Sequence, residues 1–230
     1  MKADASRSIF FSLIVICGAG CATTHDTEYA LRCTVVRKLG TARYRPAEST
    51  TWVPLNTQDR VQQGTLQTDM AKSSYLDLRI DDFPEPSTEI EWKRPTFEGF
   101  KPQAPANTVR LWGNSAISLD KVAMHARFGR WKHPKHVRLR LHAGTVLCFM
   151  RDLPSGSDCE IVFAAGRVKL EPGVYDINST GEVAVGKGKA CVKLGDMKEC
   201  EIPQGFRFDA KTGELLRLPE NVFHGYERAQ

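Results

Sequence analysis

Val137-Arg138-Leu139-Arg140-Leu141-His142 alternates strictly between apolar and cationic or polar side chains. Because successive side chains of a β-strand point to opposite faces, the segment predicts a strand with one face in a core and a charged outer face. Shorter alternations recur at 75–80 and 109–111, between Gly, Pro, Asn and Asp turn residues. The pattern predicts an all-β fold, a roll or sandwich of short strands and hairpins.

Two turn signals support this fold class. Asn178-Ser179-Thr180-Gly181 and Gly195-Asp196 each separate two strand-like segments. In the second turn, Gly195 at the first central position suits a type II′ hairpin. A helical pattern is weak throughout, and the best candidate for a helix is the short segment 118–128. Residues 82–108 hold five of the twelve prolines and little alternation. Because proline donates no ladder hydrogen bond, this stretch is predicted to be a long surface excursion.

The N-terminus has the features of an export signal. Lys2 and Arg7 precede an apolar run of about nine residues, which is too short for a membrane-spanning helix. Gly18-Ala19-Gly20-Cys21 resembles the bacterial lipobox, in which the cysteine becomes the lipid-modified N-terminus. We therefore expect a signal peptide at 1–20, lipid attachment at Cys21 and a polar tether at 21–30. The alternative is an uncleaved membrane anchor. Ala22 after the cysteine favours the outer membrane, facing the periplasm.

The cysteines indicate disulfides rather than zinc. The chain has seven cysteines, no C-x-x-C pair and no zinc-type Cys/His spacing. Because an exported chain meets an oxidising compartment, we expect a cross-strand bond between Cys191 and Cys200 across the Gly195-Asp196 turn. A bond between Cys148 and Cys159 is the competing pair, and Cys33 is left as the odd thiol.

A cluster of cations lies in a stretch without acidic residues, between Asp120 and Asp152. Clustered cations raise the local concentration of anions, so the cluster predicts an anion-binding patch, although a solvated strand face is the plainer interpretation. The expected partners are an envelope protein or an anionic envelope polymer, and not nucleic acid. His133 and His136 alone do not make a metal site, and no cofactor is expected. The patch comprises Arg127, Arg130, Lys132, Lys135, Arg138 and Arg140.

Several segments, in order, resemble the FecR-like domain family. The first are 34–44, 52–55 and 61–68, of which the last resembles a hairpin of the family, and Ser74-Tyr75-Leu76-Asp77-Leu78 follows. Val109-Arg110-Leu111-Trp112-Gly113-Asn114, Gly173-Val174-Tyr175-Asp176-Ile177 and Gly205-Phe206-Arg207-Phe208-Asp209 follow. The resemblance implies one FecR-like β domain over 31–230, with the proline-rich stretch as an insertion.

The resemblance implies an envelope binding, sensing or scaffolding module without catalytic activity. With only eight residues before the apolar run, we expect no cytoplasmic signalling segment of the kind that the family's transmembrane regulators carry. The alternative is a cell-wall-acting enzyme with Cys148 as nucleophile and a nearby histidine, for which His142 is the candidate. The formal net charge of +5 does not by itself distinguish these functions.

Overall fold

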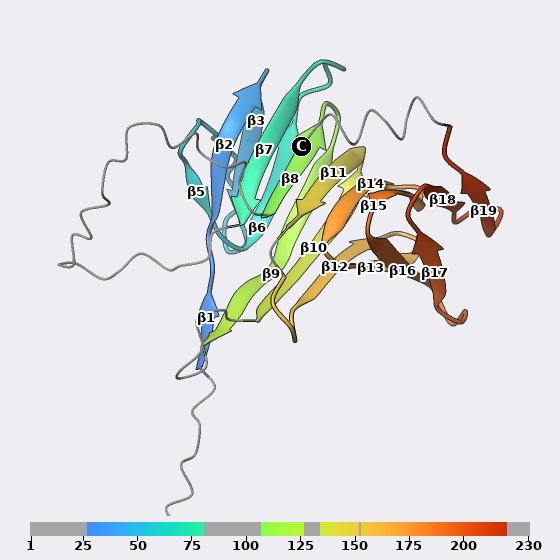
Figure 1. Cartoon of the computed structure of the whole chain (residues 1–230). Coiled ribbons are helices and arrows are strands. Elements are labelled where there is room, and N and C mark those ends of the chain that lie inside the picture. The colour runs from blue at the N-terminus through green and yellow to red at the C-terminus, as the bar shows by residue number, and fades with distance from the viewer. Residues whose placement is uncertain (1–26, 81–106, 127–133, 152, 220–230) are drawn as a thin grey trace, which may run out of the picture.

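The computed structural model describes residues 27–80, 107–126, 134–151 and 153–219, which form nineteen strands in two sheets (Figure 1). Sheet A contains β1 (Thr27–Ala30), β3 (Ala42–Pro46), β4 (Val53–Pro54), β6 (Gly64–Thr68), β9 (Ala116–Ala126), β10 (Lys135–Ala143), β12 (Asp158–Phe163), β13 (Gly166–Leu170), β16 (Lys189–Leu194) and β17 (Cys200–Pro203). Sheet B contains β2 (Cys33–Leu39), β5 (Arg60–Val61), β7 (Tyr75–Ile80), β8 (Asn107–Trp112), β11 (Thr145–Met150), β14 (Gly173–Asn178), β15 (Glu182–Lys187), β18 (Phe206–Asp209) and β19 (Glu214–Arg217).

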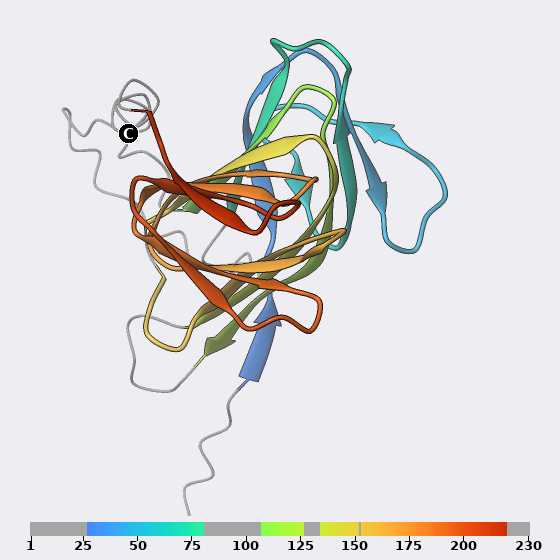
Figure 2. The same cartoon turned by 90° about the vertical axis from the view of Figure 1, so that its right-hand side faces the viewer.

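The two sheets face each other across one apolar core (Figure 2). In β10, Val137, Leu139 and Leu141 are buried, whereas Arg138 and Arg140 between them are exposed. Sheet B contributes Val146, Cys148 and Met150 of β11 to the same core. The predicted all-β sandwich is therefore confirmed, and its cause is the period-two burial of each strand.

The chain changes sheets mostly after two strands. The hairpins β7–β8, β9–β10, β12–β13, β14–β15, β16–β17 and β18–β19 alternate between the sheets. From β7 onward strand β11 is the exception, because it enters sheet B alone. Its neighbours in the chain, β10 and β12, consequently lie side by side in sheet A and are parallel. Because of this parallel pair, the charged side chains of β10 lie beside the outward side chains of β12 and β13 on one face of sheet A.

Two sequence expectations on secondary structure differ from the fold. The best candidate for a helix, 118–128, is a strand as far as Ala126, where the described part of that segment ends, because 118–126 belong to β9. A β-bulge at Asp120 separates the inward Leu119 and Val122 by three residues, a spacing that imitates a helix. The expected tether is also shorter, because Thr27–Ala30 pair with β9 as β1.

Other expectations lie wholly or partly outside the described residues. These include the signal peptide, Cys21 and residues 81–106 of the proline-rich stretch. Asn107 and Thr108, the last two residues of that stretch, belong to β8. Within the part of the chain that the structure describes, no helix is long and apolar enough to cross a membrane.

Candidate binding site on the outer face of sheet A

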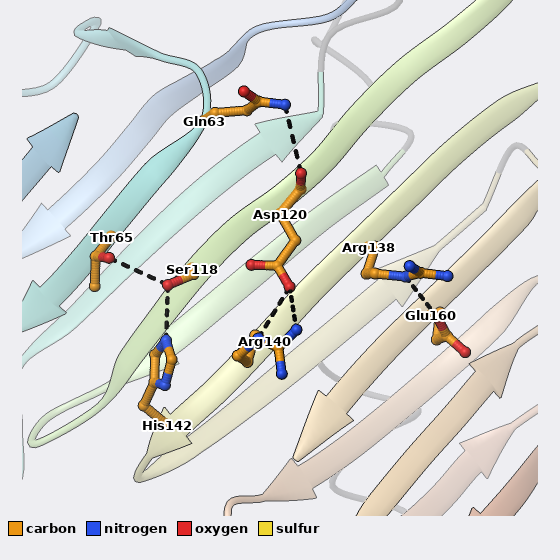
Figure 3. A network of polar contacts seen from close by, with 8 residues as sticks. All are labelled: Gln63, Thr65, Ser118, Asp120, Arg138, Arg140, His142 and Glu160. Atoms are coloured by element: carbon orange, nitrogen blue, oxygen red, sulfur yellow. Dashed lines mark hydrogen bonds and ion pairs between the residues drawn. The ribbon is translucent and has the colours of Figure 1, made fainter. Parts of the chain in front are cut away.

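Polar side chains from β6, β9, β10 and β12 meet on the outer face of sheet A (Figure 3). The hydroxyls of Thr65 and Ser118 lie 3.1 Å apart, and the Ser118 hydroxyl lies 2.7 Å from Nε2 of His142. Gln63 donates to the backbone carbonyl of Asp120 at 3.5 Å. These contacts link β9 to its neighbours on the face that also carries the charged groups.

The bulge in β9 places an acid on this face. Lys121 is opposite Arg138 and Leu119 is opposite Leu139, which leaves Asp120 as the extra residue. A bulge re-aims the extra side chain, so Asp120 and Lys121 both leave the core. The Asp120 carboxylate accepts from Nε of Arg140 at 3.0 Å and lies 2.8 Å from Nη2. This contact fixes the position of the Arg140 guanidinium.

Glu160 of β12 is a buried acid beneath two arginines. Its side chain is only 3% exposed, although it belongs to the outward-facing set of β12. Nε of Arg138 donates to its carboxylate at 2.8 Å, and Nη1 of Arg167 lies 3.2 Å away. A buried carboxylate is stable only when it is paired, and here two half-exposed guanidinium groups pair with it from β10 and β13.

A groove of about 570 Å³ opens beside these pairs. Four cations line it, together with Glu160, Val162 and Phe163 of β12 and with Ala164, Ala165, Gly166 and Gly195. Gly166 permits a close approach of β13 and β16, because a Cβ at this position would collide with the carbonyl oxygen of Lys193. The groove therefore has an excess of positive charge. Its cations are Arg138, Arg140, Arg167 and Lys193.

The structure brings together only part of the expected anion-binding patch. Arg138 and Arg140 lie on the outer face, but each is paired with an acid. Lys135 is only 3% exposed, so it does not belong to an exposed patch as expected. The reason is the period of two, which puts it on the same side of β10 as Val137. Arg127, Arg130 and Lys132 lie outside the described residues.

Sequence reasoning missed Arg167 and Lys193 as members of this site. They lie far from the basic cluster in the chain and reach Arg140 only through the pairing of β10, β12, β13 and β16. The alternation Arg167-Val168-Lys169-Leu170 was a usable signal for an outward-facing cation. The neighbour of that cation across the sheet could not be predicted without the strand order.

The histidines form a pair rather than a metal centre. The rings of His125 and His136 meet edge to face, 4.6 Å between centroids, and Nε2 of His125 lies 3.1 Å from the Glu28 carboxylate. Burial, and then the charge of His125, lowers the pKa of His136. Within the described residues no group of three potential ligands is close enough to hold a metal ion. His133 lies outside these residues.

Cys191 and Cys200 do not face each other. The Gly195-Asp196 turn forms as predicted, with Met197 N–H donating to Leu194 at 2.8 Å. Pairing then resumes with Cys200 opposite Val192 and Glu201 opposite Cys191. This register is one residue away from the expected one, so the two thiols point to opposite faces of the sheet. The expected disulfide is therefore contradicted, and both residues are free thiols.

The competing pair lies in the core. Cys148 of sheet B and Cys159 of sheet A are buried free thiols, and the sulfur of Cys159 is 3.9 Å from that of Met150. Burial raises the pKa of Cys148 well above its ordinary value and that of Cys159 to about 12. Both thiols are therefore protonated at neutral pH. Cys33 is buried in the same core.

Comparisons with known proteins give one structural neighbour. The chain is similar to a solved structure from Parabacteroides distasonis, described as a "putative anti-sigma factor", at 15% identity and a TM-score of 0.35. The match covers 48% of this chain and 50% of that one, so this chain spans about half the neighbour's length. No family model matches the chain. No curated protein matches it either.

Proposed function

We propose that this chain is an exported lipoprotein, anchored through Cys21 in the cell envelope, whose β-sandwich binds a partner without catalysing a reaction. Its partner is an envelope protein or an anionic envelope polymer. The observation that carries the proposal is the groove on sheet A, where four cations face solvent beside only one lining acid. Such a site attracts anions and holds them against a rigid sheet.

A FecR-like architecture is part of this proposal. The segments that resemble the family coincide with strands: 34–44 includes most of β2 and the first three residues of β3, and 61–68 includes β6. The later segments coincide with β8, β14 and β18. This agreement supports a sensing or scaffolding domain, because the resembling residues build the sandwich rather than a separate catalytic centre.

The geometry disfavours the enzyme alternative. Cys148 is buried, and its raised pKa leaves no thiolate for nucleophilic attack. His142 lies on the outer face of sheet A, whereas Cys148 lies on the core side of sheet B. A cysteine nucleophile needs an exposed, low-pKa thiol within reach of its base. We therefore retain binding as the proposed activity.

Anchoring is tested by metabolic labelling of the full chain with a fatty-acid analogue. The wild type should carry the label and fractionate with membranes, and Cys21→Ser should lose both properties. Cys33→Ser is the matched control, since it removes a thiol that lies beyond the lipobox-like segment, and it should keep the label. Equal labelling of the wild type and Cys21→Ser would contradict the lipoprotein proposal.

Partner binding is tested with isolated envelopes. The binding of the chain to isolated envelopes, measured without the fatty-acid label, should decrease steeply as the salt concentration rises. The reason is that exposed charges are screened over about 8 Å at physiological ionic strength. Binding that is independent of salt, or absent, would contradict an anionic partner.

A further inference from the structure

One row of side chains across sheet A contains cations and no acid. The strand register places Arg140 of β10 opposite Val162 of β12, Val162 opposite Arg167 of β13, and Arg167 opposite Lys193 of β16. All four residues line the groove. The neighbouring row, Arg138, Glu160 and Lys169, has an acid at its centre. The acid-free row is therefore the most positive part of the groove.

Arg167 and Lys193 form an unfavourable pair by themselves. Like charges that lie directly opposite each other on adjacent strands destabilise a sheet. Glu160 contacts Arg167, but it also neutralises Arg138. Lys193 has no ion-pair partner among the described residues. An anion held between Arg167 and Lys193 would relieve this repulsion, which gives the arrangement a physical reason.

Val162 makes room for such an anion. It is a short side chain between two long cationic ones, Arg140 of β10 and Arg167 of β13. Adjacent strands are about 4.8 Å apart, so Arg140 and Arg167 are separated by roughly 10 Å across Val162. The acids already hold one part of each guanidinium: Asp120 binds Arg140, and Glu160 binds Arg167. The cations are thus oriented before a ligand arrives.

We propose that this row, Arg140, Val162, Arg167 and Lys193, binds a phosphoryl group. This ligand class rests on the proposed binding function. A phosphoryl group presents three acceptor oxygens in different directions, which matches two guanidinium groups and one ammonium around a short side chain. A carboxylate has only two oxygens in one plane and leaves one cation unpaired. The phosphoryl group belongs to a lipid headgroup or to a soluble phosphate ester of the envelope.

The test uses the full chain carrying Cys21→Ser, so that no lipid anchor contributes. Titration calorimetry with inorganic pyrophosphate should give saturable binding, and malonate should bind much more weakly. Lys193→Gln should weaken pyrophosphate binding roughly tenfold, the factor that corresponds to about 1.4 kcal/mol. Lys169→Gln is the matched control: it removes an exposed cation from the same face, outside the groove lining, and should change affinity less than about twofold.

Flotation with vesicles identifies the source of the phosphoryl group. Binding to phosphatidylcholine vesicles that contain phosphatidic acid, lost in Lys193→Gln and absent with phosphatidylcholine alone, assigns a lipid headgroup. Pyrophosphate binding without such flotation assigns a soluble phosphate. The proposal is overturned if neither probe binds, if malonate binds as well as pyrophosphate, or if both lysine variants lose affinity equally. Because these measurements use no envelope and no anchor, their failure is distinguishable from failure of the lipoprotein proposal.

Discussion

At the residue scale, Glu160 controls the charge of the groove. Its carboxylate is buried and contacts both Arg138 and Arg167. The two arginines are about half exposed, so water solvates them on the side away from Glu160. The charge of Glu160 is consequently stabilised mainly by the two arginines, whereas the charges of the arginines are also stabilised by water. It also lowers the positive charge that an incoming anion meets.

Replacing Glu160 therefore has two opposite effects. Glu160→Gln should lower the free energy of unfolding by about 2 kcal/mol, because the charge-assisted hydrogen bond from Arg138 and the ion pair with Arg167 both weaken at a buried carboxylate. The same change should increase affinity for pyrophosphate, since a negative charge leaves the groove. Denaturant unfolding and calorimetric titration measure the two effects. Glu171→Gln is the control: Glu171 is exposed, pairs with Lys189 at 3.2 Å and lies outside the groove lining, so both quantities should change little.

A variant Glu160→Gln with reduced pyrophosphate affinity would contradict this account of the groove. An unchanged free energy of unfolding in Glu160→Gln would contradict the stabilising role of the buried carboxylate.

At the element scale, the bulge in β9 connects the core to the polar face. Leu119 and Val122 both point inward although three residue steps separate them, because Asp120 is accommodated as an extra residue. Without the bulge, strict alternation would carry one of these two aliphatic side chains to the outer face. The extra residue therefore preserves the core while adding an acid beside Arg140.

Deleting a residue tests this role. Removal of Asp120 should restore strict alternation between Leu119, Lys121 and Val122, so the protein should fold with a loss of only about 1 kcal/mol, the order of a surface ion pair. Removal of Ser118, two positions earlier, should cost at least about 2 kcal/mol, because Ile117 or Leu119 must then leave the core. Thermal and denaturant unfolding compare the two. A Ser118 deletion as stable as the Asp120 deletion would contradict the bulge assignment.

At the scale of the whole molecule, the core between the sheets determines which thiols react. Cys148 and Cys159 come from opposite sheets and are shielded by both. Cys191 is partly exposed at the surface of sheet A, and burial raises its pKa to a smaller extent. Access to the first two thiols therefore requires the sheets to separate, whereas Cys191 is accessible in the native fold.

Alkylation followed by peptide mass spectrometry checks this order. In the native protein the partly exposed Cys191 and Cys200 should be modified first, and Cys148 and Cys159 should react only at denaturant concentrations that unfold the sandwich. A non-reduced peptide map should contain no Cys191–Cys200 bond, because these side chains lie on opposite faces of the sheet. Cys191→Ser should leave the unfolding midpoint unchanged. A Cys191–Cys200 bond in the map would contradict the strand register.

The sequence by itself determined the class of fold and the inward and outward faces of single strands. The alternation in β10 assigns Val137, Leu139 and Leu141 to a core, because the period of a strand is a local property of the backbone. The Gly195-Asp196 turn was predictable for the same reason, since its geometry depends on neighbouring residues alone.

The tertiary structure decided everything that depends on register and strand order. One extra residue after the Gly195-Asp196 turn separates Cys191 from Cys200, and a bulge at Asp120 turns a helix-like spacing into a strand. The parallel pairing of β10 with β12 then places Arg167 and Lys193 in the same row across the sheet as Arg140. A one-residue shift reverses the face of every side chain, and which strands become neighbours depends on core packing over the whole chain.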